Sequence, residues 1–181
     1  MVVAIAQPRG GRQRYCCRFT KAKFFYSLFA LPEGKSNYAL DFGDWMSLIQ
    51  LDSNHTQPVA AQTAWLADAL AKRGAVPLKF ACYHRPAWGT GTKGNITEIQ
   101  AQWSPLFEQH GVLAAFENDH HVYKRSRPLK AGAVTDDGVL YLGDGAWGVE
   151  TRKIPPSASG LNYLAKFASE RHLIVATITA A

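Results

Sequence analysis

Residues 38–53 read Tyr-Ala-Leu-Asp-Phe-Gly-Asp-Trp-Met-Ser-Leu-Ile-Gln-Leu-Asp-Ser, two largely apolar segments that are separated by Gly43 and Asp44. Glycine and aspartate between two such segments are typical of a tight turn that joins antiparallel strands. The sequence therefore predicts a hairpin whose strands cover residues 38–42 and 45–51.

Helical and strand patterns alternate after this hairpin. Pro58 suits a first helical turn, apolar side chains recur every three or four positions after it, and Gly74 suits the end of a helix. A helix is therefore expected over residues 58–73, and the alternation as a whole predicts an α/β fold with a mixed sheet. Three further strands are expected at short apolar segments, namely residues 78–83, 112–116 and 139–142.

Turn and capping signals lie between and after these strands. Residues 87–95 contain three glycines and predict a loop. Thr97 and Gln100 are spaced as a capping box at the start of the next helical stretch, which Pro105 either kinks or divides into two helices. For the C-terminal region the sequence predicts a helix near residues 161–170 and a last strand over residues 173–179.

The composition is that of one soluble globular domain, since the chain has 181 residues of which 47% are hydrophobic and 19% charged. The formal net charge of +6 is concentrated at the N-terminus: the first 35 residues, which include a basic leader, contain seven Lys or Arg and one acid. Such a leader either binds polyanions or is solvated, and without a groove-reading helix we do not expect nucleic acid as a partner. No apolar segment approaches the roughly 20 residues that cross a bilayer, so no membrane contact and a cytoplasmic location are expected.

Polar residues follow three of the predicted strands at the point where each strand ends. Residues 52–56 follow the hairpin, His84 follows the strand at 78–83, and Asn-Asp-His-His at 118–121 follows the strand at 112–116. Ligands of α/β sheets bind outside the carboxyl ends of the strands. We therefore expect these three polar clusters to converge at one edge of the sheet.

Asp119, His120 and His121 place a carboxylate and two imidazoles in successive positions. These groups are ligands of zinc, manganese and iron, and in an extended chain Asp119 and His121 would point to the same side. Together with His84, the cluster favours a metal site, although a polar surface loop and a hydrogen-bonded structural histidine are the alternatives. Two cations follow the cluster and either hold a phosphate or form a solvated basic turn, namely Lys124 and Arg125.

Five segments of the chain can be compared with a known family: residues 38–53, 62–66 (Gln-Thr-Ala-Trp-Leu), 83–86 (Tyr-His-Arg-Pro), 116–125 and 141–145 (Tyr-Leu-Gly-Asp-Gly). In sequence and in order they resemble the calcineurin-like metallophosphoesterases close to the purple acid phosphatases, over about residues 24–148. The resemblance implies a partial phosphoesterase sandwich that lacks its N-terminal strands. Residues 1–23 would then be an unmatched leader and residues 24–181 the C-terminal part of the domain.

The resemblance also implies a site. His84 would bind the second metal and His121 the first, while Asp119 stands where the family has a histidine, since the family order His-Asp-His is Asp-His-His here. The implied cofactors are two divalent ions of iron, zinc or manganese, or fewer ions in this chain. Further candidate ligands of a metal or substrate are His120, Asp52 and His55, and Lys124 and Arg125 would face the phosphate.

The implied activity is hydrolysis of phosphoric esters by a metal-bound hydroxide, with a small phosphorylated molecule as the substrate. In the family, Asp-x-His, Gly-Asp and Gly-Asn-His motifs precede the matched segments, and no such series occurs before Phe24. A carboxylate that bridges two ions roughly 3.5–4 Å apart is therefore missing. The alternative function is a non-catalytic remnant or a domain that binds a metal or an anion, and a longer reading frame upstream of Met1 is expected.

Overall fold

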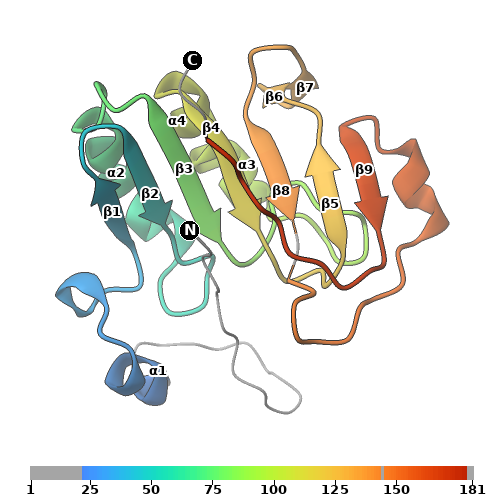
Figure 1. Cartoon of the computed structure of the whole chain (residues 1–181), viewed down its shortest axis with the longest axis horizontal. Coiled ribbons are helices and arrows are strands. Elements are labelled where there is room, and N and C mark those ends of the chain that lie inside the picture. The colour runs from blue at the N-terminus through green and yellow to red at the C-terminus, as the bar shows by residue number, and fades with distance from the viewer. Residues whose placement is uncertain (1–21, 144, 179–181) are drawn as a thin grey trace.

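The computed structural model describes residues 22–143 and 145–178, which form a seven-stranded mixed sheet with helices on one face (Figure 1). The α/β fold predicted from the sequence is therefore confirmed. The basic leader that was predicted over residues 1–23 lies outside the described residues except for its last two positions. Within the described ranges, no helix is both long enough and apolar enough to cross a membrane.

The elements that were predicted between residues 38 and 117 begin and end close to their predicted positions, whereas the elements at residues 23–34 and 123–126 were not predicted. The helices are α1 (Lys23–Leu28), α2 (Val59–Ala71), α3 (Thr97–Gln102) and α4 (Ser104–Gln109), with short 3-10 helices η2 (Pro32–Gly34) and η3 (Pro156–Gly160). The strands of the large sheet are β1 (Tyr38–Phe42), β2 (Met46–Gln50), β3 (Leu78–Tyr83), β4 (Val112–Glu117), β5 (Tyr123–Ser126), β8 (Leu140–Gly143) and β9 (Leu164–Ala168). Strands β6 (Leu129–Lys130) and β7 (Ala133–Val134) pair separately.

The large sheet has the strand order β1-β2-β3-β4-β8-β5-β9. Strands β2, β3, β4 and β8 are parallel, whereas β1 pairs antiparallel with β2, and β5 pairs antiparallel with both β8 and β9. The predicted hairpin is β1–β2, and its turn begins at Gly43, whose φ of +61° favours glycine. Because parallel strands end at the same edge, the segments that follow β2, β3 and β4 leave the sheet side by side.

Helices α2, α3 and α4 cover one face of the sheet and bury the apolar core against it (Figure 1). Ile49 and Tyr83 from the sheet are fully buried against Leu66 of α2 and against Trp103 and Phe107. The Tyr83 ring lies edge-on to Trp103 and stacked on Phe107, with centroid distances of 5.7 Å and 6.3 Å. Each such side chain contributes about 1.5–3 kcal/mol on burial, so the helices hold the strand ends in fixed positions.

Two predictions for the C-terminal region are wrong. The expected helix near residues 161–170 is the strand β9, which pairs with β5. Without this partner, β5 would be a sheet edge with unpaired backbone groups, and this pairing outweighs the weak local preference for a helix. Within the described part of the chain, residues 173–178 form no strand, and Leu173 and Val175 are 57% and 73% exposed.

The predicted capping box is also wrong. Helix α3 has Ile96 as its N-cap, Thr97 is already its first residue, and no side-chain cap hydrogen bond forms. Gln100 instead donates from Nε2 to the carbonyl of Ala87 at 2.7 Å, which ties the glycine-rich loop to α3. The division of the helical stretch is confirmed, since α4 is a separate helix with Pro105 in its first turn.

Candidate functional site

Hydrogen bonds join the segments that follow the three parallel strands. Ser53 Oγ accepts from the backbone N–H of Arg85 at 2.8 Å, which links the end of β2 to the end of β3. The backbone N–H of Asn118 donates to the His84 carbonyl at 2.8 Å, and the Asn118 side-chain amide donates to the Tyr83 carbonyl at 3.0 Å. These bonds hold the polar clusters of the three strand ends at one edge of the sheet.

His84 lies at the centre of this edge. Its Nε2 is 3.4 Å from Oδ1 of Asp119, and its ring contacts the His55 ring with a centroid distance of 4.8 Å. Burial and the neighbouring His84 lower the pKa of His55. The structure therefore brings His55, His84 and Asp119 together, each from a different strand end.

Lys93, a residue for which the sequence suggested no role, joins this group from the glycine-rich loop. Its ammonium donates to Oδ1 of Asp119, the same oxygen that faces His84. Burial alone would raise the pKa of Asp119, but hydrogen bonds and charge from His84 and Lys93 outweigh burial and hold that pKa well below its usual value. Asp119 is therefore ionised, and its partner in the described structure is a lysine.

Asp52 stabilises its own loop. Its carboxylate accepts from the backbone N–H groups of His55 and Thr56 at 2.6 Å and 2.9 Å, and Oδ1 lies 3.8 Å from Nδ1 of His55. Gln62 of α2 clamps the same position through bonds of 2.9 Å and 2.7 Å to the Asp52 backbone N–H and carbonyl. Asp52 therefore positions His55, and its carboxylate oxygens are already hydrogen-bonded within the loop.

His120 lies beneath the glycine-rich loop. It is only 2% exposed, and a Cβ built on Gly89 would lie 2.2 Å from its Cε1. Burial, followed by the charge of Lys124, lowers the pKa of His120 to about 4, so the ring is neutral. Its Nδ1 lies 3.4 Å from the N–H of Thr90, and its Nε2 has no hydrogen-bond partner among the described residues. His120 supports the loop that carries Lys93.

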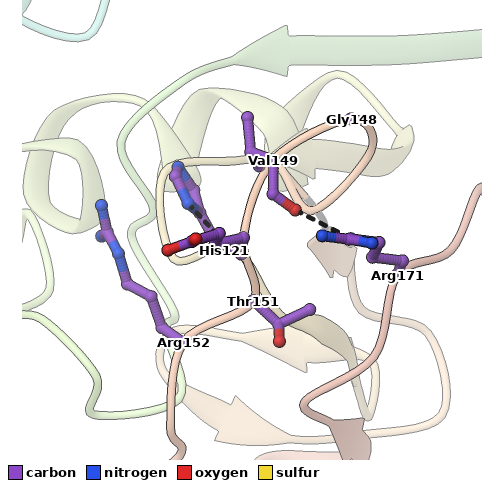
Figure 2. Close-up of a pocket in the computed structure, with 7 residues that line it drawn as sticks. His121, Gly148, Val149, Thr151, Arg152 and Arg171 are labelled. Carbon is purple, nitrogen blue, oxygen red and sulfur yellow. Dashed lines mark hydrogen bonds between the residues drawn. The ribbon is translucent and has the colours of Figure 1, made fainter.

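His121 lines a pocket to which neither His84 nor Asp119 contributes, although the charges of Lys93 and Asp119 act on its pKa. Asp119 and His121 both have left-handed backbones, with φ of +64° and +55°, so the chain turns here and the side chains do not share one face. Nδ1 of His121 is 3.1 Å from the carbonyl of Glu150, and the ring lines an open pocket of about 560 Å³ (Figure 2). The other lining residues are Gly148, Val149, Glu150, Thr151, Arg152 and Arg171.

Two arginines of this pocket point in different directions. Arg171 donates from Nε to the Val149 carbonyl at 3.3 Å, whereas the guanidinium of Arg152 points away from Val149 (Figure 2). Arg152 instead donates from Nη1 to the carbonyl of Asp119 at 2.9 Å. The pocket therefore has no pair of converging cations, and Arg152 adds its positive charge to the neighbourhood of Asp119.

Lys124 is buried in the core. It is 1% exposed, and its ammonium donates to Oε2 of Glu117 and to the Trp88 carbonyl, so it does not face a ligand. Glu117 also accepts from Tyr83 Oη at 2.6 Å and from the Ala87 N–H at 2.7 Å. Adjacent strand residues point to opposite faces, and Arg125 is accordingly exposed on the other side of β5. The buried pair anchors the start of the glycine-rich loop.

The described residues do not fit a two-metal centre. His84 Nε2 and Asp119 Oδ1, 3.4 Å apart, have a separation that suits two ligands of one tetrahedral ion at about 2.1 Å from each. However, in the part of the chain that the structure describes, no group of three or more His, Cys, Asp or Glu could hold a metal. The Lys93 ammonium already donates to Oδ1 of Asp119, and His121 lines a pocket to which His84 and Asp119 do not contribute.

No family model and no curated protein matches the chain, but solved structures with a similar fold include a purple acid phosphatase. Purple acid phosphatase PPD1 from yellow lupin (Lupinus luteus) seeds has a TM-score of 0.69 at 16% identity, covering 81% of this chain and 29% of that protein. PhoD has a TM-score of 0.56 at 13% identity (78% and 36% covered), and GAP50, the anchor in the inner membrane complex of Plasmodium, has 0.57 at 13% (75% and 44% covered).

The mixed α/β sheet therefore resembles a fragment of a purple acid phosphatase. The chain spans less than half of the length of each of these three proteins. At these identities the likeness concerns the fold alone.

Proposed function

We propose that this protein is part of a phosphoric ester hydrolase of the metallophosphoesterase lineage. In this proposal the described residues bind the phosphate group and supply ligands for at most one metal ion. The observation that carries the proposal is the meeting of His84 and Asp119 at 3.4 Å, at the carboxyl edge of parallel strands. Ligands of α/β sheets bind at this edge. The likeness of the fold to that of a purple acid phosphatase agrees with this assignment.

The charges around Asp119 suit a phosphate ester. Lys93 contacts its carboxylate, Arg152 contacts its carbonyl, and Arg85 lies close enough to influence the pKa of His55. Positive groups of this kind attract and orient an anionic ester in a partly buried site. Hydrolysis with two bound metal ions would require further ligands, among them a bridging carboxylate, beyond those that the described residues offer.

A second candidate function is binding of a phosphate ester without hydrolysis. The observation that favours it is the ammonium of Lys93 on the oxygen of Asp119 that a metal would use. A lysine ammonium can neutralise a carboxylate and attract a phosphate, but it cannot generate a metal-bound hydroxide. In this case the site would bind a phosphate ester but would not hydrolyse it.

The test is hydrolysis of p-nitrophenyl phosphate by the purified chain with added Mn²⁺ or Zn²⁺, together with a measurement of metal content. For a hydrolase we expect metal-dependent turnover that falls by roughly a hundredfold in Asp119→Asn and in His84→Ala, the scale of losing one electrostatic contact in a transition state. His121→Ala is the matched control and should leave turnover unchanged, because His121 lies in the neighbouring pocket.

Three outcomes separate the alternatives. Two metals per chain with loss of turnover in His121→Ala would reject the geometry described above. Binding of p-nitrophenyl phosphate without turnover would support the second candidate function. Neither binding nor turnover in the folded chain would reject both.

A further inference from the structure

We propose that Lys93 is a tethered cation that replaces a metal ion beside Asp119 and His84, so that this site binds the phosphate group of an ester without a metal. This inference rests on the second candidate function proposed above, binding of a phosphate ester without hydrolysis, because a site that excludes the metal would not show the metal-dependent turnover expected of the hydrolase. What is new is the assignment of a specific side chain to the cation position and the metal independence that follows from it.

The contacts of Asp119 are the first observation that supports a lysine in the position of a metal ion. The Lys93 ammonium and His84 Nε2 both approach Oδ1, so a metal bound to this oxygen would compete with the ammonium for it. The side chain of Asp119 is 11% exposed and that of Lys93 is 32% exposed. The pair is therefore partly shielded from water, where an ion pair is stronger than on an open surface.

The anchoring of the glycine-rich loop that carries Lys93 is the second supporting observation. The Gly89 N–H donates to Asn95 Oδ1 at 2.9 Å, and the Gly89 carbonyl accepts from Tyr163 Oη at 2.6 Å. Thr90 and Thr92 contact each other through their hydroxyl oxygens at 2.9 Å, directly before Lys93. The glycine-rich loop that carries Lys93 is therefore held by bonds that do not involve Asp119.

The balance of charges around Asp119 is the third supporting observation. Lys93 neutralises the carboxylate of Asp119, whereas Asp52 accepts from neutral backbone N–H groups and keeps its negative charge. With the guanidinium groups of Arg85 and Arg152, these groups have a positive excess at this edge. Such an excess favours an anionic phosphate ester over a neutral ligand.

The first measurement is calorimetric titration of the chain with Mn²⁺, in the wild type and in Lys93→Met. Methionine keeps the length of the side chain and removes its charge, so the variant should bind Mn²⁺ at least about tenfold more tightly, because one positive charge leaves direct contact with the ligand oxygen. Lys166→Met, which removes an exposed lysine from β9, is the matched control and should bind as the wild type does.

The second measurement is binding of inorganic phosphate in the presence of a chelator. The wild type should bind phosphate, Lys93→Met should bind it at least about tenfold more weakly, and Lys93→Arg should restore part of the affinity. Circular dichroism spectra of all variants establish that they are folded. Unchanged Mn²⁺ affinity or unchanged phosphate affinity in Lys93→Met would each overturn the proposal. Absence of ester turnover would count against the hydrolase alone, because neither titration measures turnover.

Discussion

Replacement of Glu117 by Gln tests the buried pair that anchors the glycine-rich loop. Glu117 and Lys124 are each 1% exposed, and Glu117 receives hydrogen bonds from Lys124, Tyr83 and the backbone of Ala87. Glutamine keeps the shape of the side chain and an acceptor oxygen for Tyr83 and Ala87. However, it turns an amide donor towards the ammonium of Lys124 and removes the only charge in direct contact with that ammonium in the described structure.

The expected cost follows from leaving one buried charge without its partner, which typically destabilises a protein by about 3–5 kcal/mol. Burial lowers the pKa of Lys124, so loss of its proton relieves part of the penalty. We therefore expect a loss of about 3 kcal/mol, a large fraction of the 5–15 kcal/mol that a domain usually has. With a urea dependence of about 2 kcal/mol/M, the unfolding midpoint falls by roughly 1.5 M.

Urea unfolding followed by circular dichroism measures this change. Glu170→Gln makes the same chemical change at an exposed position and should stay within about 0.5 kcal/mol of the wild type. The double variant Glu117→Gln, Lys124→Met removes both charges and should recover more than half of the loss. The reasoning is refuted if the single variant loses less than about 1 kcal/mol, or if the double variant is no more stable than the single one. Should the single variant not fold, recovery of folding in the double variant decides.

Two further changes test the loop and the hairpin. Gly89→Ala would bring a Cβ to 2.2 Å from Cε1 of the buried His120, so we expect a loss of about 1–3 kcal/mol and a lower melting temperature; an unchanged melting temperature would place the ring elsewhere. Arg73 donates two hydrogen bonds of 2.7 Å to Asp41, which is half exposed, so Arg73→Met should cost less than about 1 kcal/mol at neutral pH. The bonds from Arg73 lower the pKa of Asp41, so this stabilisation is present above the usual aspartate pKa and is lost as the pH falls through the lowered one. Unfolding curves of wild type and variant should therefore converge in acid, and a constant difference would contradict the pairing.

The elements that could be predicted from the sequence are those in which the local sequence pattern favours the same structure that the tertiary contacts require. The β1–β2 hairpin carries both its turn residues and its apolar segments within residues 38–51, and α2 carries its own helical spacing. Strand β9 could not be predicted in this way, because its extended form depends on the edge of β5, a partner about 40 positions earlier in the chain. Local β-propensity does not determine which distant strands pair or in which register they do so.

The candidate site was predictable to the same degree. Polar residues at the ends of parallel strands predicted that His84 and Asp119 would meet, since this follows from topology alone. The position of His121 did not follow, because the left-handed backbone at Asp119 and His121 breaks the alternation of an extended chain. Lys124 belongs to the buried face of β5, and a basic stretch gives no signal that one of its members pairs with a glutamate.

Lys93 is the clearest case of a residue that only the folded chain identifies. In sequence it is one lysine in a glycine-rich loop, and nothing near it signals a carboxylate partner. Its partner lies 26 positions later, and the two meet because Glu117 fixes the start of the loop while Asn118 fixes the turn that carries Asp119. The buried pair of Glu117 and Lys124 therefore serves the site indirectly. This pair stabilises the backbone that brings the Lys93 ammonium to Asp119. The stability of the core and the charge of the site therefore depend on the same two residues.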